Sequence, residues 1–287
     1  MSARPPRRAP SGPPRRGRGG PAASARVNRR PTTRDKEGVG GEQIEGRRAV
    51  LELLRANRRS VQRLLIADGQ DPAEILDQIE REAQRRRVPI HVVSMARLDR
   101  EARTEGHQGV VAFASRLETV HLDDLIAARH PFLLVCDGVT DPRNLGAMLR
   151  SADGAGVTGV VLPRHRSARI VPTVTKTAAG AIEYLTFSDV GGIPSALDVM
   201  NKAGILTVGL AGESADSLYK LDLASTPVAL VVGGEERGLA ALTRKRCATV
   251  VSIPQSGKVS SLNASVALSV AAFEVARQRR RHDSGNS

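Results

Sequence analysis

The second half of the chain alternates short apolar runs with segments of helical periodicity. Two of the runs, Phe132-Leu-Leu-Val-Cys and Val228-Ala-Leu-Val-Val, are apolar throughout and do not alternate with polar residues. A continuous apolar run is typical of a strand buried on both faces, as in a parallel sheet that is covered by helices. The alternation therefore predicts an α/β domain with a mostly parallel sheet.

This larger domain is expected over residues 132–281, with a short tail at 282–287. Its strands are expected at 132–137, 158–162, 205–210, 228–233 and 249–253, and its helices at 144–155, 172–180, 194–203 and 263–280.

A second, smaller α/β pattern precedes it, over residues 42–117. Strands are expected at 61–67, 89–93 and 110–114. Helices are expected around Ala49 to Leu54, from Asp71-Pro72 onward, and from a capping Ser94 to Leu98. A linker over 118–131 carries one short helical turn, Leu122 to Ala127.

The charge of the chain is concentrated at its ends. Residues 1–41 hold eleven Lys/Arg against two Asp/Glu and almost no large apolar residues, so nothing offsets their ordering entropy, and a disordered basic arm is predicted. Residues 277–287 are also basic, whereas the body between is nearly neutral. This distribution favours a folded enzyme tethered to a polyanion by its tails. A merely solubilising N-terminal extension explains the arm equally well.

Several classes of protein are disfavoured. Cys136 and Cys247 fit no metal spacing, and Cys136 is expected to be a small buried hydrophobe. We expect no metal site, a reducing cytoplasm, no membrane span and no secretory signal. There is no G-x-S-x-G elbow, Gly257-Lys258 is followed by Val, and the glycines at 233–238 lack dinucleotide-binding spacing.

Three polar or Gly-rich segments follow predicted strands. They are Asp137-Gly-Val-Thr-Asp-Pro-Arg-Asn-Leu-Gly-Ala-Met-Leu-Arg150, Val232-Gly-Gly-Glu-Glu-Arg-Gly238 and Ile253-Pro-Gln-Ser-Gly-Lys-Val-Ser-Ser-Leu-Asn263. Ligands of α/β sheets bind outside the carboxyl ends of the strands, so the three segments are expected to meet in one cavity. Asn144 and Asn263 each stand at the start of a predicted helix and are plausible caps.

In order and spacing these segments resemble the signature motifs of the SpoU/TrmH family of RNA ribose 2′-O-methyltransferases, over about Ile44 to Ala276. The resemblance implies a deep trefoil knot in the larger domain, S-adenosylmethionine as cofactor, and a homodimer packed partly by the C-terminal helix. The catalytic residues that it implies are Asn144, Arg150, Glu235, Ser261 and Asn263. The cofactor-binding residues that it implies are Leu210, Ala211, Gly212, Gly234, Ile253 and Leu262.

The smaller domain resembles the ribosomal-protein-like substrate-binding domain of one branch of this family, with His107-Gln108-Gly109-Val110 as its signature. RNA contacts are expected from His107, Gln108 and Arg143. That branch methylates a guanosine in the peptidyl-transferase region of large-subunit rRNA, which is the function expected here. The alternatives are a tRNA or thiostrepton-resistance-type rRNA adenosine methyltransferase of the same fold, or a non-catalytic RNA-binding ribosome-assembly factor.

In the family, the residue that corresponds to Arg150 is favoured for activating the ribose hydroxyl. A guanidinium is a poor general base because its pKa is above about 12. We therefore hypothesise that Arg150 stabilises developing negative charge and grips a phosphate.

Overall fold

The computed structural model describes residues 39–165, 167–258 and 261–285. The basic arm predicted over 1–41 lies outside them except at its end, where the prediction is wrong. Val39 is buried in the core of the larger domain, Gly40 forms a parallel bridge with Ile170, and the Gly41 N–H donates to the Ile170 carbonyl at 2.7 Å. The ordered chain therefore begins before residue 42.

The smaller domain is a four-stranded sheet in the order β1-β4-β2-β3. The strands are β1 (Gln43–Glu45), β2 (Val61–Ala67), β3 (Ile90–Val93) and β4 (Val110–Ala114). Helices α1 (Arg47–Ala56) and α2 (Glu74–Arg85) cover one face, and the shorter α3 (Met95–Glu101) packs through Leu98 on the other.

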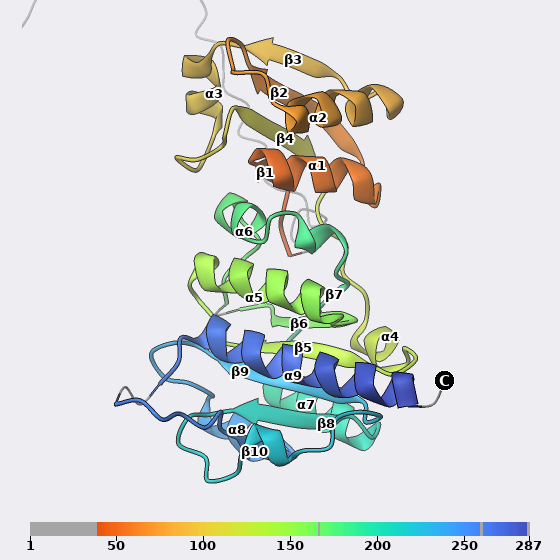
Figure 1. Ribbon diagram of the computed structural model, residues 1–287, viewed down its shortest axis with the longest axis vertical. Helices are drawn as coiled ribbons and strands as arrows, with labels where there is room; N and C mark the ends of the chain where they lie inside the picture. The colour runs from red at the N-terminus through yellow and green to blue at the C-terminus, as the bar shows by residue number, and fades with distance from the viewer. Residues whose placement is uncertain (1–38, 166, 259–260, 286–287) are drawn as a thin grey trace, which may run out of the picture. The chain divides into compact units, whose positions relative to one another are not determined.

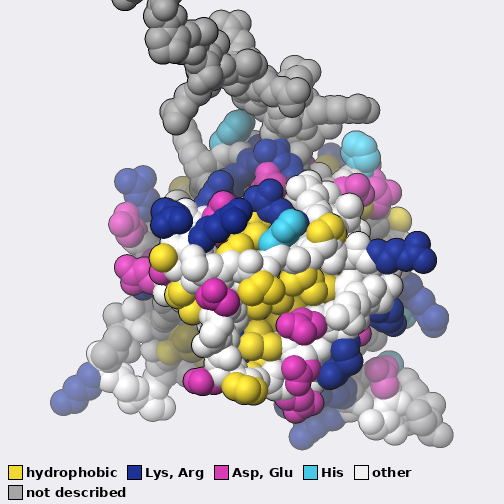
Figure 2. Space-filling model, turned by 90° about the horizontal axis from the view of Figure 1, so that it is seen from above, with side chains coloured by type: hydrophobic (Ala, Val, Ile, Leu, Met, Phe, Trp, Pro, Cys, Tyr) yellow, Lys and Arg dark blue, Asp and Glu magenta, His cyan; other side chains and the backbone are white. Residues whose placement is uncertain are grey.

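Viewed from above, this end of the molecule shows hydrophobic side chains gathered in the middle, with cations along one border (Figure 2). Val92 and Met95 are among the exposed hydrophobic residues of this domain.

Strand β1 was not expected, because its sequence, Gln-Ile-Glu, is mostly polar. Its polar residues are nevertheless buried, since the Glu45 carboxylate accepts hydrogen bonds from the backbone N–H groups of Arg103 at 2.7 Å and Thr104 at 3.0 Å. These bonds tie β1 to the segment that follows α3. A polar strand of this kind has no periodic signal in the sequence.

The larger domain has a six-stranded sheet, β10-β8-β9-β5-β6-β7, whose neighbouring strands are all parallel, as predicted. Its strands are β5 (Phe132–Asp137), β6 (Gly159–Pro163), β7 (Phe187–Val190), β8 (Leu206–Leu210), β9 (Val228–Gly233) and β10 (Thr249–Val251). The edge strand β7 was not expected, because its sequence, Phe-Ser-Asp-Val, lacks the continuous apolar run of the central strands.

Helices cover both faces of this sheet (Figure 1). Alternate residues of β5 separate into two cores: Leu134 and Cys136 face α5, α6 and α9, whereas Leu133 and Val135 face α7. This explains why the run is apolar throughout. The helices are α4 (Leu122–Ile126), α5 (Pro142–Ala155), α6 (Pro172–Thr177), α7 (Ile193–Lys202), α8 (Ala241–Arg246) and α9 (Ala264–Gly285).

Several helix boundaries differ from expectation. Helix α6 ends at Thr177 because Ala179 and Gly180 have positive φ values of 51° and 95° and turn the chain into the short 3-10 helix η2 (Ala181–Glu183). Helix α9 runs to Gly285, beyond the predicted end at 280. Neither Ser94 nor a residue beside Asp71-Pro72 caps its helix through a side chain, and the short α8 was not foreseen.

Cys136 is buried as expected, and burial raises the pKa of its thiol to about 12.

None of the helices in the described part of the chain is both long and apolar enough to cross a membrane. The trefoil knot stays a prediction of the family resemblance.

Candidate active site

Three loops meet at the carboxyl edge of the larger sheet. They follow β5, β9 and β10, and the β5 and β9 loops touch directly. The Gly234 N–H donates to the Asp137 carbonyl at 3.1 Å, and the Ala240 N–H donates to the Asp137 carboxylate at 2.8 Å. Parallel pairing of β5 with β9 brings their ends together, so the topology itself produces this meeting.

A polar cluster formed by Asn144, Glu235 and Asn263 joins the three loops. The Glu235 carboxylate accepts hydrogen bonds from the amide nitrogens of both asparagines, with a distance of 2.9 Å to Asn263 Nδ2. Asn263 Nδ2 also donates to Asn144 Oδ1 at 3.1 Å. A single carboxylate therefore fixes the orientation of two amides that are far apart in the sequence.

The two asparagines differ in how they relate to their helices. Asn263 caps α9 as predicted, because its Oδ1 accepts from the Ser265 N–H at 2.8 Å. Asn144 does not cap α5. The cap is Asp141, whose carboxylate accepts from the Arg143 N–H at 3.0 Å and from the Asn144 amide at 2.8 Å. These bonds, the Arg143 bond foremost, lower the pKa of Asp141. Asn144 lies inside the helix, and its amide is left for the cluster.

A cavity of about 900 Å³ lies between the ends of β8, β9 and β10 and the start of α9. All six residues expected to bind the cofactor line it, and so do Glu235, Ser261 and Asn263. Its lining also includes Glu213, which ends the loop after β8, and five further residues of the motif segments: Val232, Gly233, Arg237, Gly238 and Gln255. The remaining lining residues were not predicted because they are mostly small or apolar and flank the motifs: Leu239, Ala240, Ala241, Arg244, Val251, Ala264 and Ala267.

Two glycines are required where the loops pack. A Cβ on Gly234 would lie 2.5 Å from the Gly138 carbonyl oxygen, and one on Gly233 would overlap the Gly238 backbone. Gly238 has a φ of 60° and donates its N–H to the Gly234 carbonyl at 2.9 Å. The Gly-rich motif therefore folds into a tight turn against the first loop.

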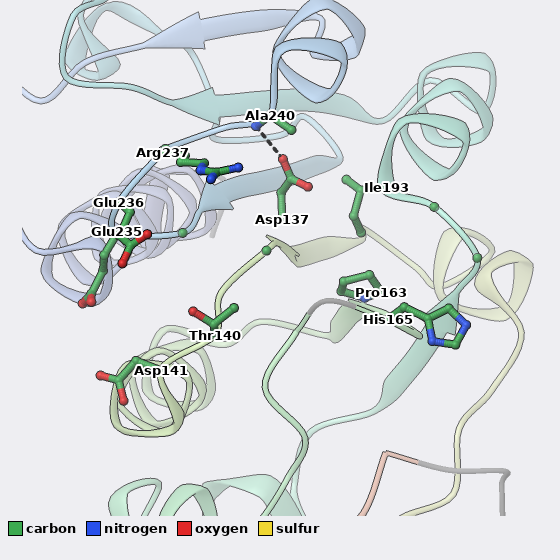
Figure 3. Close-up of a pocket in the computed structure, with 15 residues that line it drawn as sticks. Asp137, Thr140, Asp141, Pro163, His165, Ile193, Glu235, Glu236, Arg237 and Ala240 are labelled. Carbon is green, nitrogen blue, oxygen red and sulfur yellow. Dashed lines mark hydrogen bonds between the residues drawn. The ribbon is translucent and has the colours of Figure 1, made fainter.

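A second cavity, of about 1100 Å³, lies on the other side of this turn, at the ends of β5, β6 and β7 (Figure 3). The two cavities share Gly234, Glu235, Arg237, Gly238 and Ala240 in their linings. In Figure 3 the Asp137 carboxylate points toward the Ala240 backbone, and His165 lies at the far side of the cavity. The turn at 234–240 is thus the wall between the cavities.

Arg150 does not line either cavity within this chain, contrary to the expectation that it lies beside the methyl donor. It lines a separate cavity with Arg48, Glu52 and Tyr184. The reason is helical geometry: six residues separate Asn144 from Arg150, which is a rise of about 9 Å and a large rotation around the helix axis.

The residues expected to contact RNA have different surroundings. His107 is buried: its Nδ1 accepts from the Gly109 N–H at 3.1 Å, and its Nε2 lies 2.8 Å from Asp99 Oδ1. The Gln108 side chain accepts from the Arg47 N–H at 3.0 Å. Both side chains therefore form hydrogen bonds within the domain. Arg143 is exposed in the first turn of α5, next to the polar cluster.

Comparisons with known proteins identify both domains. Residues 131–273 match the SpoU rRNA methylase family, and residues 43–120 match an RNA 2′-O ribose methyltransferase substrate-binding domain. The 23S rRNA (guanosine-2′-O-)-methyltransferase RlmB of Shewanella oneidensis is 42% identical over 241 residues, which cover 83% of this chain and 97% of that protein. RlmB of Pseudomonas aeruginosa is 41% identical over 246 residues, which cover 83% and 97%.

Among solved structures, the SpoU methyltransferase AviRb from Streptomyces viridochromogenes superimposes with a TM-score of 0.70 and 26% identity, covering 87% of this chain and 92% of that one. An RNA 2′-O ribose methyltransferase superimposes with a TM-score of 0.68 and 27% identity, covering 83% and 88%. AviRb has also been solved in complex with the cofactor AdoMet. With both domains matched and the motif loops meeting at one sheet edge, the chain belongs to the SpoU family of rRNA methylases.

Proposed function

We propose that this protein transfers a methyl group from S-adenosylmethionine to the ribose 2′-hydroxyl of a guanosine in 23S rRNA. The observation that carries the proposal is the meeting of Asn144, Glu235 and Asn263 beside a cavity lined by all six expected cofactor residues. The named activity of the similar RlmB proteins supplies the substrate class. Residues 42–117 would bind RNA, 118–131 would link the domains, and 132–281 would transfer the methyl group in the cytoplasm, where ribosomes are assembled.

The residues of the 900 Å³ cavity suit an adenosine-containing cofactor. Leu210, Ile253 and Leu262 offer apolar surface for an adenine ring, and the loop backbones offer N–H and C=O groups to its polar edge. When bound, S-adenosylmethionine supplies a methyl group that is already activated by its sulfonium. The chain must then position the ribose hydroxyl in line with that methyl group, and positioning of this kind contributes several kcal/mol.

Glu235 is proposed as a positioning residue. By accepting from both asparagine amides, it holds the first and third loops in one geometry around the reacting groups. Ser261 and Asn263 line the cavity directly and are proposed to contact the substrate ribose or the cofactor.

Arg150 can serve this reaction only if a second copy of the chain brings it to the cavity. Helices α5 and α9 lie side by side (Figure 1), with Ser151 and Ser269 hydrogen-bonded at 2.7 Å. Helix α9 also exposes Val266 and Phe273. We propose a homodimer in which these helices form the interface and Arg150 of one copy faces the cofactor cavity of the other.

The activity is tested by incubating the purified protein with radiolabelled S-adenosylmethionine and separate transcripts of 23S rRNA and tRNA. Label at one guanosine ribose of 23S rRNA is the expected result. Label in tRNA, or at an adenosine, would support the alternative methyltransferase functions. Cofactor binding without transfer to any RNA would contradict the proposal.

The dimer is tested by mixing two inactive variants, Arg150→Ala and Asn263→Ala. If the site is shared between copies, each mixed dimer contains one intact site, and activity returns to as much as half of the wild-type value per mixed dimer. If each chain builds its own site, every site in the mixture keeps one defect, and no activity returns.

A further inference from the structure

The cavity that contains Arg150 lies at the junction of the two domains. It has a volume of about 420 Å³ and lies between α1 of the smaller domain and the α5 and α6–η2 region of the larger one. Its polar lining is Arg48 and Glu52 from α1, Arg150 and Asp153 from α5, and Tyr184 after η2. Both domains therefore contribute charged side chains to one surface.

The two arginines of this cavity have no bonding partner among the described residues, whereas the Glu52 carboxylate has two. In the described part of the chain, neither Arg48 nor Arg150 forms an ion pair or a side-chain hydrogen bond. Glu52, by contrast, pairs with Arg55 at 3.2 Å and accepts the Tyr184 hydroxyl at 2.7 Å. Asp153 is the remaining carboxylate, and partial burial raises its pKa. The lining holds two arginines and two carboxylates, and both arginines can receive an anionic ligand because neither has a partner within the described residues.

Lys176 on α6 extends this cationic surface past the N-terminal end of α1. Its side chain lies against Gly46 and Gly106 of the smaller domain, where a Cβ on Gly106 would overlap the ammonium group. Within residues 39–165, 167–258 and 261–285, Lys176 has no anionic partner either. We call Arg48, Arg150 and Lys176 the junction cations.

A buried ion pair joins the two domains next to Tyr184. Arg59 of the smaller domain binds both carboxylate oxygens of Glu183 of the larger one, at 2.9 and 2.5 Å, and the two side chains are 4% and 1% exposed. Arg58 adds hydrogen bonds to the carbonyls of Glu183 and Leu185, both at 3.3 Å. These bonds join the two domains beside the junction cavity.

We propose that two of the junction cations, Arg48 and Lys176, each bind a phosphate of the RNA substrate, and that the exposed Tyr184 ring stacks against a base. This proposal rests on the proposed function and adds to it a path for the RNA substrate across the two domains.

An RNA strand fits this surface better than a small anion does. The cations are spread over three helices from two domains, which suits a chain of phosphates. Tyr184 is one of only two tyrosines in a chain with no tryptophan, yet 47% of it is exposed beside these cations. Single-stranded nucleic acids are bound by this combination of cations along the backbone with an aromatic face for a base.

The test measures binding of a 23S rRNA transcript to the full-length protein as a function of salt concentration. Arg48→Ala and Lys176→Ala are expected to weaken RNA binding several-fold each, and to lower the slope of log affinity against log salt by about 0.7–1 each. Tyr184→Ala is expected to weaken binding about fivefold or more with no change of slope, because stacking releases no counterions. Arg81→Ala is the control: Arg81 is an exposed arginine on α2 of the same domain that does not line the junction cavity, and its loss should leave the affinity within twofold.

Affinity for S-adenosylmethionine, measured by calorimetry, should be unchanged in all four variants, since none of these residues lines the cofactor cavity. Wild-type affinity and salt slope in both Arg48→Ala and Lys176→Ala would overturn the inference, even if the wild-type enzyme methylates 23S rRNA. Failure of the wild-type protein to methylate any RNA would instead count against the proposed function.

Discussion

Two clusters of polar side chains hold distant parts of this chain together, and they differ in their access to solvent. At the domain junction, Arg59 and Glu183 are almost completely buried and satisfy each other. At the sheet edge, Asn144, Glu235 and Asn263 also satisfy one another, but Glu235 and Asn263 line an open cavity of about 900 Å³.

This difference in exposure separates a cluster that stabilises the fold from one that serves the reaction. A buried charge without its partner is strongly destabilising, so the junction pair must remain intact for the two domains to stay docked. A cluster at a cavity wall can relax toward water when one member is lost. Its loss should therefore cost activity far more than stability.

The largest effect is expected from Glu183→Gln. The substitution leaves the Arg59 guanidinium buried without a counter-charge, and the free energy of unfolding should fall by about 3–5 kcal/mol, as measured by urea denaturation. Asp198→Asn, at the exposed pair with Arg246, is the control and should cost less than about 1 kcal/mol. Equal effects of the two substitutions would mean that burial does not distinguish the junction pair.

Glu235→Ala tests the polar cluster at the sheet edge. Without the carboxylate, the two asparagine amides lose their shared acceptor, and misplacement of the reacting groups should lower kcat on the order of 100-fold. The free energy of unfolding should change by less than about 1 kcal/mol. Glu235→Gln, which keeps an acceptor oxygen, should recover most of the activity. A loss of stability as large as that of Glu183→Gln would remove the distinction between the clusters.

His107→Ala is a smaller perturbation, and it examines a residue whose motif suggested RNA contact. The substitution leaves the buried Gly109 N–H without its acceptor, and it should lower the free energy of unfolding by about 1–3 kcal/mol. Affinity for a 23S rRNA transcript, measured below the unfolding transition, should stay within twofold. Strong loss of RNA affinity in a folded His107→Ala protein would restore the contact role.

The smallest effect is expected from Asp141→Ala, which removes the cap of α5 and should cost about 1 kcal/mol at neutral pH. Hydrogen bonds lower the pKa of Asp141 in the folded state, so its contribution is present above the ordinary carboxyl pKa of about 4 and is lost as the pH falls through the lowered value. The stability difference between wild type and variant should therefore shrink below about pH 4. A difference that is constant with pH would show that the charged carboxylate is not what caps the helix.

The sequence by itself determined the strands that are marked by a continuous apolar run. The apolar runs of β5 and β9 are buried from both sides, so their composition fixed both their position and the parallel sheet. The three motifs at strand ends likewise predicted one shared cavity, because parallel strands that follow one another through helices end at the same edge. The lining of that cavity by Leu210, Gly234 and Leu262 follows from this rule.

Only the tertiary structure decided which partner each polar side chain has. Asn144 and His107 each belong to a recognisable motif, yet the Asn144 amide donates to Glu235 and the His107 ring bonds to Asp99 and Gly109. The tertiary structure also places Arg150 at the domain junction and outside the cofactor cavity of its own chain. Periodicity reports the face of an element that is buried, but hydrogen-bond partners depend on the three-dimensional meeting of elements that are a hundred residues apart in the chain.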